Sequence, residues 1–250
     1  MRNFNDTYLN NYFSHIISLD GNDPRGIDVG LLIKRSRTDI AIEQIRTHMD
    51  DAKKGSTVKR HSVPGFGYSA TSVIFSRDCL EVDLQVAGKT LTIMANHLKA
   101  QDRTPKVSDA RRKLQAEHVA ALVDIAVRQN KLPVVMGDLN VDAQSKSGQT
   151  IGALSKHPAL KDVYAGFPKK QAWTHYYDSQ DSVSRLDYIL PHKSLKVLTP
   201  SGANVSPTDI IRQGLTTKAM KHYAGPRYGT IGPMHTEASD HCPVTVALEL

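Results

Sequence analysis

Cysteine is scarce in this sequence, where only Cys79 and Cys242 occur in 250 residues. Two cysteines so far apart cannot form a disulfide framework. They are typical of buried or half-buried thiols in a reducing compartment, and we expect both to be unpaired.

Long apolar runs are also missing, and no stretch is long enough to cross a bilayer. Residues 1–6 contain no apolar signal core, which favours a cytoplasmic location and leaves open a longer precursor. The chain has no internal repeat and no low-complexity segment. With 40% hydrophobic and 23% charged residues, it has the composition of a globular protein, and we expect one domain over residues 1–250.

Acidic residues are the minority charge, with 25 Asp and Glu against 32 Lys and Arg, for a net charge of +7. Such a surplus suits a polyanionic partner, nucleic acid above all, although many basic enzymes bind none. Several cations crowd the segment just after His97, namely Lys99, Arg103, Lys106, Arg111, Arg112 and Lys113.

The first part of the chain predicts a short helix and several strands. Apolar residues from Phe4 to Phe13 indicate a helix end. Runs at 16–19, 27–34, 40–45 and 71–75 indicate strands, with a turn at 20–26 and a surface loop at 50–59.

The middle of the chain carries the clearest pattern. Runs at 80–86 and 90–95 flank a short glycine turn and predict a β-hairpin whose first arm has one solvent-facing side. Residues 108–129 predict a helix capped by Ser108, with an apolar stripe of Ala110, Leu114, Ala121, Leu122 and Ile125. A buried strand at 132–136 follows. The hairpin, the helix and this strand together favour an α/β or α+β layered fold.

The end of the chain is less regular. We expect a weak helix at 151–154, an irregular stretch over 201–238 that belongs to a functional surface, and a last strand at 244–250.

Polar residues stand where four of these predicted strands begin or end. Asn96 and His97 close one strand, and Asp138 and Asn140 follow another. Asp187 lies inside a strand at 184–190, and Asp240-His241 precedes the last strand. Alternate side chains of an extended backbone face the same way, so Asp138 and Asn140 can point into one site. The four stretches together predict a shared site.

Each stretch also has an ordinary structural explanation. The Gly-Asp-x-Asn sequence at 137–140 is good turn chemistry, and His97 alone is typical of a buried, hydrogen-bonded imidazole. A buried Asp187 needs a partner, which is either Arg185 in a salt bridge or a histidine, with His241 as the candidate. The 11 histidines show none of the paired spacings of zinc sites, which argues against a zinc cage.

Four motifs in this order resemble the endonuclease/exonuclease/phosphatase superfamily of metal-dependent phosphoesterases, over about residues 1–250. They are Asn-His-Leu-Lys at 96–99, Gly-Asp-Leu-Asn at 137–140, Ser-Arg-Leu-Asp-Tyr-Ile at 184–189 and Ser-Asp-His at 239–241. The resemblance implies an α/β four-layer sandwich of two mostly antiparallel β-sheets packed face to face, with helices outside.

The resemblance also implies roles for individual residues. His241, held by Asp187, would contact the scissile phosphate and help to activate water, while Asp138 would take part in proton transfer. Asn140 would orient the phosphate or the nucleophile, and His97 would face the charge that develops on the phosphate. The implied phosphate-binding residues are Asn96, Lys99 and Arg111, and the implied ligands of Mg²⁺ or Mn²⁺ are Asp240, Asp138 and Asn140.

The beginning of the chain departs from the family pattern. Members begin with a strand that bears an Asn and a strand that ends in Gln-Glu, whose Glu binds the metal. Neither strand occurs here, and Glu43 comes too late to be that residue. Truncation, completion of the sheet by another segment, self-association and loss of activity are all compatible with this departure. The leading hypothesis is a nuclease; the alternatives are a phosphatase of small molecules and a silent fold that binds polyanions or a partner.

Overall fold

The computed structural model describes residues 1–49, 74–102, 104–198, 209–233, 236–237 and 239–250. Its strands are β1 (Phe13–Ser18), β2 (Gly30–Lys34), β3 (Ala41–Arg46), β4 (Cys79–Val86), β5 (Lys89–His97), β6 (Leu132–Asp138), β7 (His175–Tyr177), β8 (Ser182–Ser184), β9 (Asp187–Pro191), β10 (Lys196–Leu198) and β11 (Ala247–Glu249). Its α-helices are α1 (Arg2–Tyr8), α2 (Pro105–Arg128), α3 (Gly152–Ser155) and α4 (Lys169–Ala172), and its 3₁₀ turns include η1 (Gly148–Ile151), η2 (Asp178–Gln180) and η4 (Thr217–Lys221).

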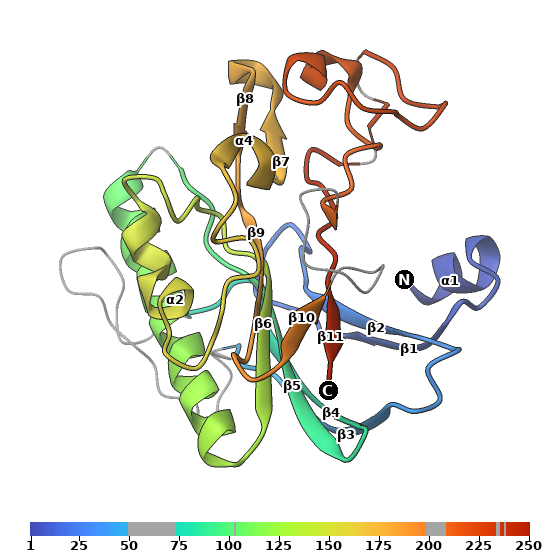
Figure 1. The fold of residues 1–250 in the computed structure, drawn as a ribbon, viewed down its shortest axis with the longest axis vertical. Coiled ribbons are helices and arrows are strands. Elements are labelled where there is room, and N and C mark those ends of the chain that lie inside the picture. Colours follow the sequence, from blue (N-terminus) through green and yellow to red (C-terminus); the bar gives the residue numbers. More distant parts are fainter. Residues whose placement is uncertain (50–73, 103, 199–208, 234–235, 238) are drawn as a thin grey trace.

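A five-stranded sheet in the order β3-β4-β5-β6-β9 forms the centre of the fold (Figure 1). The pair β5–β6 is parallel, and the other neighbours are antiparallel. A parallel pair needs a long crossover, which α2 supplies between β5 and β6. This crossover brings the carboxyl ends of β5 and β6 to the same edge of the sheet.

Helix α2 covers one face of this sheet (Figure 1). Its buried residues pack with residues of β5, β6 and β9 in one apolar cluster, which includes Ala116, Val119, Val123, Met94, Val135 and Leu190.

The pairs β1–β2 and β10–β11 lie on the other face (Figure 1). Ile17 and Ile33 of the first pair are buried with Leu80, Val82, Leu91 and Ile93 of the central sheet, and Leu248 of β11 packs on this cluster. The predicted α/β sandwich is confirmed. Its second strand layer consists, in the described part of the chain, of two separate pairs, each with strand edges that no described strand covers.

The predicted hairpin is confirmed as β4 and β5, but its solvent-facing side is not. Glu81 and Asp83 are only 7% and 1% exposed. Arg46 of β3 forms ion pairs with both carboxylates, and Lys131 lies 2.8 Å from Asp83. The alternating polar residues of β4 are therefore buried because cations distant in sequence neutralise them.

Helix α2 begins earlier than predicted and turns a different face to the core. Its N-cap is Thr104, and Ser108 is buried rather than capping. Ala121 and Ile125 of the predicted stripe are exposed. The buried positions are Ser108, Arg112, Gln115, Ala116, Val119, Val123 and Ala126. The prediction failed because polar residues with specific partners occupy part of the buried face; the Arg112 guanidinium, for example, donates to the Lys99 carbonyl at 2.6 Å.

Several boundaries differ from the predictions. The first helix ends at Tyr8, the strand expected at 27–34 starts at Gly30, and the last strand is reduced to β11. The loop at 50–59 lies outside the described residues, as do Thr71 to Val73 of the strand expected at 71–75, whose Ile74 and Phe75 are buried without strand structure. The helix near 151–154 is confirmed as η1 and α3.

Both cysteines are buried and unpaired, as expected. Among the helices that the structure describes, none has the length and apolar character that crossing a membrane requires.

Candidate active site

Three of the predicted site residues lie side by side across the central sheet. The register pairs His97, at the end of β5, with Asp138, at the end of β6. It also pairs Asp138 with Asp187, at the start of β9. Since neighbouring strands are about 4.8 Å apart, the pairing itself sets an imidazole and two carboxylates in a row at one sheet edge.

Glycine at position 137 makes this close pairing possible. Gly137 has φ +119°, a conformation that side chains rarely adopt, and a Cβ there would collide with the Asn96 carbonyl oxygen of β5. Asn140 follows with φ +57°, which turns the chain at the end of β6. The Gly-Asp-x-Asn sequence is thus both a turn and a means of placing Asp138.

The fourth stretch reaches this edge through backbone bonds to the segment around β7. His175 and His241 form an antiparallel β-bridge. The Tyr176 amide donates to the Asp240 carbonyl at 3.0 Å, and the Cys242 amide donates to the Thr174 carbonyl at 2.6 Å. Residues 66 positions apart are therefore held as a cross-strand pair rather than by side chains alone.

Asp187 and His241 form the central contact of the site. The His241 Nδ1 donates to Asp187 Oδ2 at 2.9 Å. Buried Thr174 supports this carboxylate, since its hydroxyl donates to the same oxygen at 2.7 Å and accepts from the amides of Leu186 and Asp187, each at 3.0 Å. Arg185 pairs instead with Asp162. Of the two partners considered for Asp187, the structure therefore shows the histidine.

Asp138 is bound mainly by the turn that follows it. The backbone amide of Asn140 donates to one Asp138 oxygen at 2.8 Å, and the Asn140 side-chain amide donates to the other at 2.9 Å. The same side-chain NH₂ donates to the Leu98 carbonyl at 3.1 Å. Both of its N–H groups are thus used, which leaves the side-chain oxygen of Asn140, Oδ1, to accept from water or to bind a cation.

The row of charges shifts the pKa values of the site in opposite directions. Burial and the charge of Asp187 raise the pKa of Asp138 to about 7. Burial opposes protonation of His241, but the hydrogen bond and charge of Asp187 outweigh it and raise the pKa of His241 to about 9. Burial and the charge of Arg77 lower the pKa of His97 to about 4. Near neutral pH the site therefore combines a neutral imidazole, a protonated imidazole and a carboxyl that titrates between them.

The three residues expected to bind phosphate are bonded to other groups of the protein. The buried Asn96 side chain donates to the carbonyl of Met94, within its own strand. Lys99 pairs with Asp102 at 2.8 Å. Arg111, on α2, donates from Nε to the Ile74 carbonyl at 3.1 Å. The structure does not gather these three around His241, and their assignment stays a prediction.

Glu43 cannot supply the carboxylate that the family pattern contains at its amino-terminal side. It lies on β3 next to Thr90, which donates to it at 3.3 Å. Thr90 is near the start of β5 and His97 is seven residues further along, so Glu43 is about 23 Å from the site edge at the usual rise of a strand.

Oxygen donors for a divalent cation remain at the edge. The carboxylates of Asp138 and Asp240 both act on the charge of His241, and the Asp240 side chain is 64% exposed. One or two carboxylates, an amide oxygen and waters are ligands that Mg²⁺ accepts, and substrate phosphate completes its shell. By donor chemistry Asp138, Asn140 and Asp240 suit the implied ion. Asp138 and Asp240 each lie in a possible ligand group with His241, in two different groups, and their assignment to one ion stays a prediction.

A cleft of about 420 Å³ opens beside the Asp187–His241 pair. Its wall includes Met136, Tyr188, Ile189, Leu215, Tyr228 and Val244. This apolar wall lowers the local polarity and strengthens the electrostatic interactions of the pair.

Sequence reasoning gave no role to Thr174 and His175. Thr174 binds Asp187, and the rings of His175 and His241 lie 4.7 Å apart between centroids. The only sequence signal was a polar Thr-His pair directly after an apolar Trp at the start of a strand.

Comparison with known proteins supports the resemblance seen in the sequence. The model of the Endonuclease/Exonuclease/phosphatase family matches residues 4–250. No curated protein matches the chain.

Among solved structures, a truncated Caenorhabditis elegans TDP2 is similar with a TM-score of 0.51 and 17% identity, over 76% of this chain and 65% of that one. A mannosyl-6-phosphatase of Bacteroides thetaiotaomicron has a TM-score of 0.55 and 17% identity, over 94% and 77%. TDP2 of D. rerio, in complex with a single-strand DNA product, has a TM-score of 0.50 and 14% identity, over 82% and 77%. At these identities the likeness shows the fold.

Proposed function

Because the chain belongs to the endonuclease/exonuclease/phosphatase family, we propose that it is a metal-dependent phosphoesterase with its active centre at the His97–Asp138–Asp187–His241 edge. The observation that carries this proposal is the 2.9 Å bond between Asp187 and His241, next to a carboxyl whose pKa is raised to about 7. Groups with perturbed pKa values that converge at one edge are typical of acid–base centres.

Asp138 acts as the base in this proposal. As a carboxylate it takes a proton from the water that attacks phosphorus, and Oδ1 of Asn140 accepts the other hydrogen of that water. The P–O bond to the leaving group breaks as the new P–O bond forms, and the leaving oxygen takes a proton from solvent water. The Asn140 bonds to Asp138 keep both groups in one orientation. A general base is most effective when its pKa lies near the working pH, as that of Asp138 does.

His241 stabilises charge on the phosphate. Its Nδ1 is held by Asp187, so the protonated Nε2 can donate to a phosphoryl oxygen. Neutral His97, whose Nε2 lies 3.3 Å from Asp138, adds a polar group to the same edge. A bound Mg²⁺ or Mn²⁺, held by Asp138, Asn140 and Asp240, would polarise the phosphoryl oxygen.

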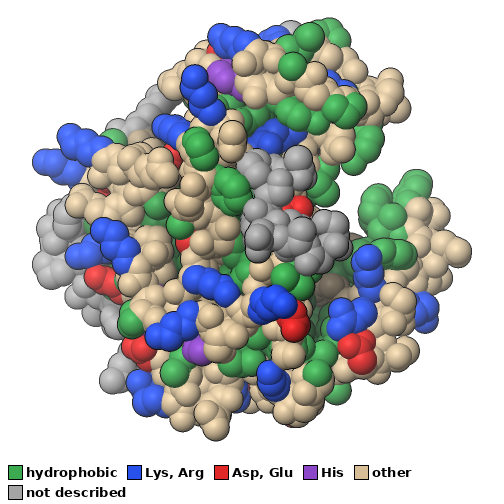
Figure 2. Space-filling view, in the orientation of Figure 1, with side chains coloured by type: hydrophobic (Ala, Val, Ile, Leu, Met, Phe, Trp, Pro, Cys, Tyr) green, Lys and Arg blue, Asp and Glu red, His purple; other side chains and the backbone are tan. Residues whose placement is uncertain are grey.

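For the substrate, we propose the phosphodiester bonds of DNA or RNA. The net charge of +7 supports this, as does the fold shared with a DNA-bound TDP2. Lys and Arg are spread over the face seen in Figure 2 and are not gathered in one patch. Nucleic-acid binding would therefore rest on several separate phosphate contacts.

A small phosphorylated molecule is the second candidate, because the cationic stretch after His97 is largely engaged within the protein. Arg112 is fully buried, Lys99 pairs with Asp102, and Lys113 pairs with Glu117 at 3.6 Å. These cations contribute less to polyanion binding than their number in the sequence indicates.

One substrate panel tests the proposal. The chain is incubated with DNA, RNA, a small phosphodiester and a small phosphomonoester, each with Mg²⁺, with Mn²⁺ and with EDTA. We expect metal-dependent hydrolysis that EDTA abolishes, and Asp138→Asn provides the background rate. Turnover of the monoester alone would favour the second candidate, and no turnover of any substrate would reject the proposed activity.

A further inference from the structure

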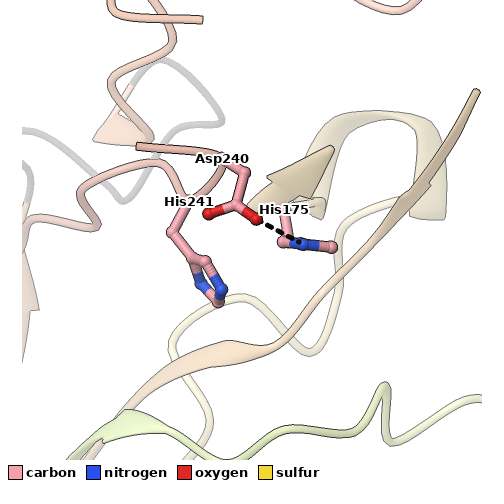
Figure 3. Close-up of side chains that lie close together, drawn as sticks. All are labelled: His175, Asp240 and His241. Atoms are coloured by element: carbon pink, nitrogen blue, oxygen red, sulfur yellow. Dashed lines mark ion pairs between the residues drawn. The ribbon is translucent and has the colours of Figure 1, made fainter. Parts of the chain in front are cut away.

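A cluster of two histidines and one aspartate shares His241 with the proposed active centre. His175, Asp240 and His241 each offer one ligand atom, and these atoms all lie within 4.8 Å of one another. Figure 3 shows the Asp240 carboxylate between the two imidazole rings. We propose that this cluster binds Zn²⁺, and that bound zinc inhibits the phosphoesterase by occupying His241.

The backbone builds this cluster. The β-bridge between His175 and His241 sets the two rings on neighbouring extended segments. The hydrogen bond from the Tyr176 amide to the Asp240 carbonyl holds the backbone of Asp240 beside them. Cross-strand neighbours of this kind have Cβ atoms about 5 Å apart, which suits ligands of one ion. The three ligands thus need little rearrangement to bind a metal.

The distances fit zinc. The His175 Nε2 and Asp240 Oδ2 lie 3.5 Å apart. Two ligands of a tetrahedral zinc ion, at bond lengths of about 2.1 Å, are separated by about 3.4 Å. This pair already has the spacing of two ligands, and only His241 has to approach.

The other nitrogen of each ring faces a partner that orients it. The His241 Nδ1 is bonded to Asp187 at 2.9 Å, and the Ser184 hydroxyl lies 3.5 Å from His175 Nδ1. Metal-binding histidines commonly have such a partner, and it leaves Nε2 as the ligand atom. Asp187 therefore prepares His241 for a metal as well as for a phosphate.

The donor atoms select the kind of ion. Two imidazole nitrogens and one carboxylate oxygen suit Zn²⁺ and related transition metals, while Mg²⁺ prefers oxygen alone. The side chains of His241 and Asp240 are 30% and 64% exposed, so an ion can enter from solvent. The spacing of histidines along the sequence gave no sign of this cluster, because its two histidines are 66 residues apart.

Inhibition follows from the shared atom, and this part rests on the proposed function. Zinc on His241 Nε2 takes the place of the proton that this nitrogen would donate to the phosphate. It also takes Asp240 from the set that would hold Mg²⁺. Zinc and catalysis therefore exclude each other at His241.

Binding is measured first, by competition between the chain and a chromophoric chelator for Zn²⁺. We expect one zinc per chain, and an affinity at least about 100-fold lower in His175→Ala and in Asp240→Ala, since even an orienting partner of a ligand is worth about 10–100-fold. Asp240 is largely exposed, so its variant keeps the test valid if His175→Ala folds poorly. His192→Ala is the matched control, because His192 lies past the opposite end of β9 from Asp187 and should bind zinc as the wild type does. Equal affinity in all four proteins would overturn the zinc site.

Inhibition is measured second. For each protein, the measurement is the zinc concentration at which the Mg²⁺-supported rate falls to half of that protein's rate without zinc. We expect this concentration to rise by about 100-fold in His175→Ala, in step with the affinity. Zinc bound at the cluster without loss of rate would overturn the inhibitory role. If the wild type hydrolyses no phosphoester, the proposed function fails, and the binding measurement alone decides the zinc site.

Discussion

At the scale of single residues, the proposed chemistry depends on two groups, Asp138 and His241, whose pKa values are both raised by their surroundings. Burial and the charge of Asp187 raise the pKa of Asp138 to about 7. The pKa of His241 is raised to about 9, because its interaction with Asp187 outweighs the effect of burial. The same carboxylate, Asp187, favours the protonated form of both neighbours. Because the groups interact, the two values describe the site as a unit.

The rate should therefore depend on pH as a bell. Asp138 must be ionised, so kcat/KM rises with pH through its pKa, which is about 7 in the metal-free site and lower when a bound cation favours the carboxylate. His241 must be protonated, so kcat/KM falls through about 9. Initial rates across this range, at fixed ionic strength, provide the measurement. A rate that keeps rising above pH 9 would show that protonated His241 is not needed.

Thr174 is a positioning residue that should act through Asp187. Replacing it by Val removes the bond to the carboxylate and leaves the amides of Leu186 and Asp187 without their acceptor. We expect a loss of about 1–3 kcal/mol in the free energy of unfolding for each group left unpaired. With Asp187 less firmly held, kcat should fall and the upper limb of the pH profile should move to lower pH.

Thr174→Ser is the matched control, because it keeps the hydroxyl. It should retain the pH profile of the wild type. If the Val variant lost stability but kept the upper limb of the profile, Thr174 would be structural only.

At the scale of elements, the close approach of β5 and β6 fixes the site. Gly137→Ala would force a Cβ against the Asn96 carbonyl oxygen in a backbone conformation that L-residues avoid. We expect a loss of at least about 2 kcal/mol in the free energy of unfolding. Urea unfolding measures it, with Gly166→Ala as the control, since no atom lies within 4 Å of a Cβ there. Equal stability of the two variants would contradict this account of the β5–β6 pairing.

The elements also show what sequence reasoning reaches. The β4–β5 hairpin and strand β6 were predictable, because their apolar runs and the glycine turn are local signals. The existence of helix α2 was predictable too, but its buried face was not. Burial of Glu81 and Asp83 was not predictable, because Arg46 and Lys131, which neutralise them, come from other parts of the chain.

The site, like the elements, was predictable in part. His97, Asp138, Asp187 and His241 were found because each lies in a polar motif at or near a predicted strand, and the structure brings all four to one edge. Thr174 and His175 were missed because their partners are reached only through the tertiary β-bridge.

At the scale of the whole molecule, the basic surplus makes a prediction about the substrate. If nucleic acid is bound through phosphates, log K should fall linearly with log salt, with a slope of about −0.9 per phosphate neutralised on duplex DNA. Fluorescence anisotropy of a labelled duplex over a salt series measures this slope. Absence of binding at low salt would point to the small phosphorylated molecule instead.

The central claim is that Asp187 and His241 act as one unit in phosphoester hydrolysis. The most direct test is a double-mutant cycle on kcat/KM with His241→Ala, Asp187→Ala and the double variant, each shown to be folded by circular dichroism. We predict that each single change lowers the rate by about 10²–10⁴-fold, and that the double variant is little worse than either. Full activity in His241→Ala, or losses that multiply in the double variant, would contradict the account.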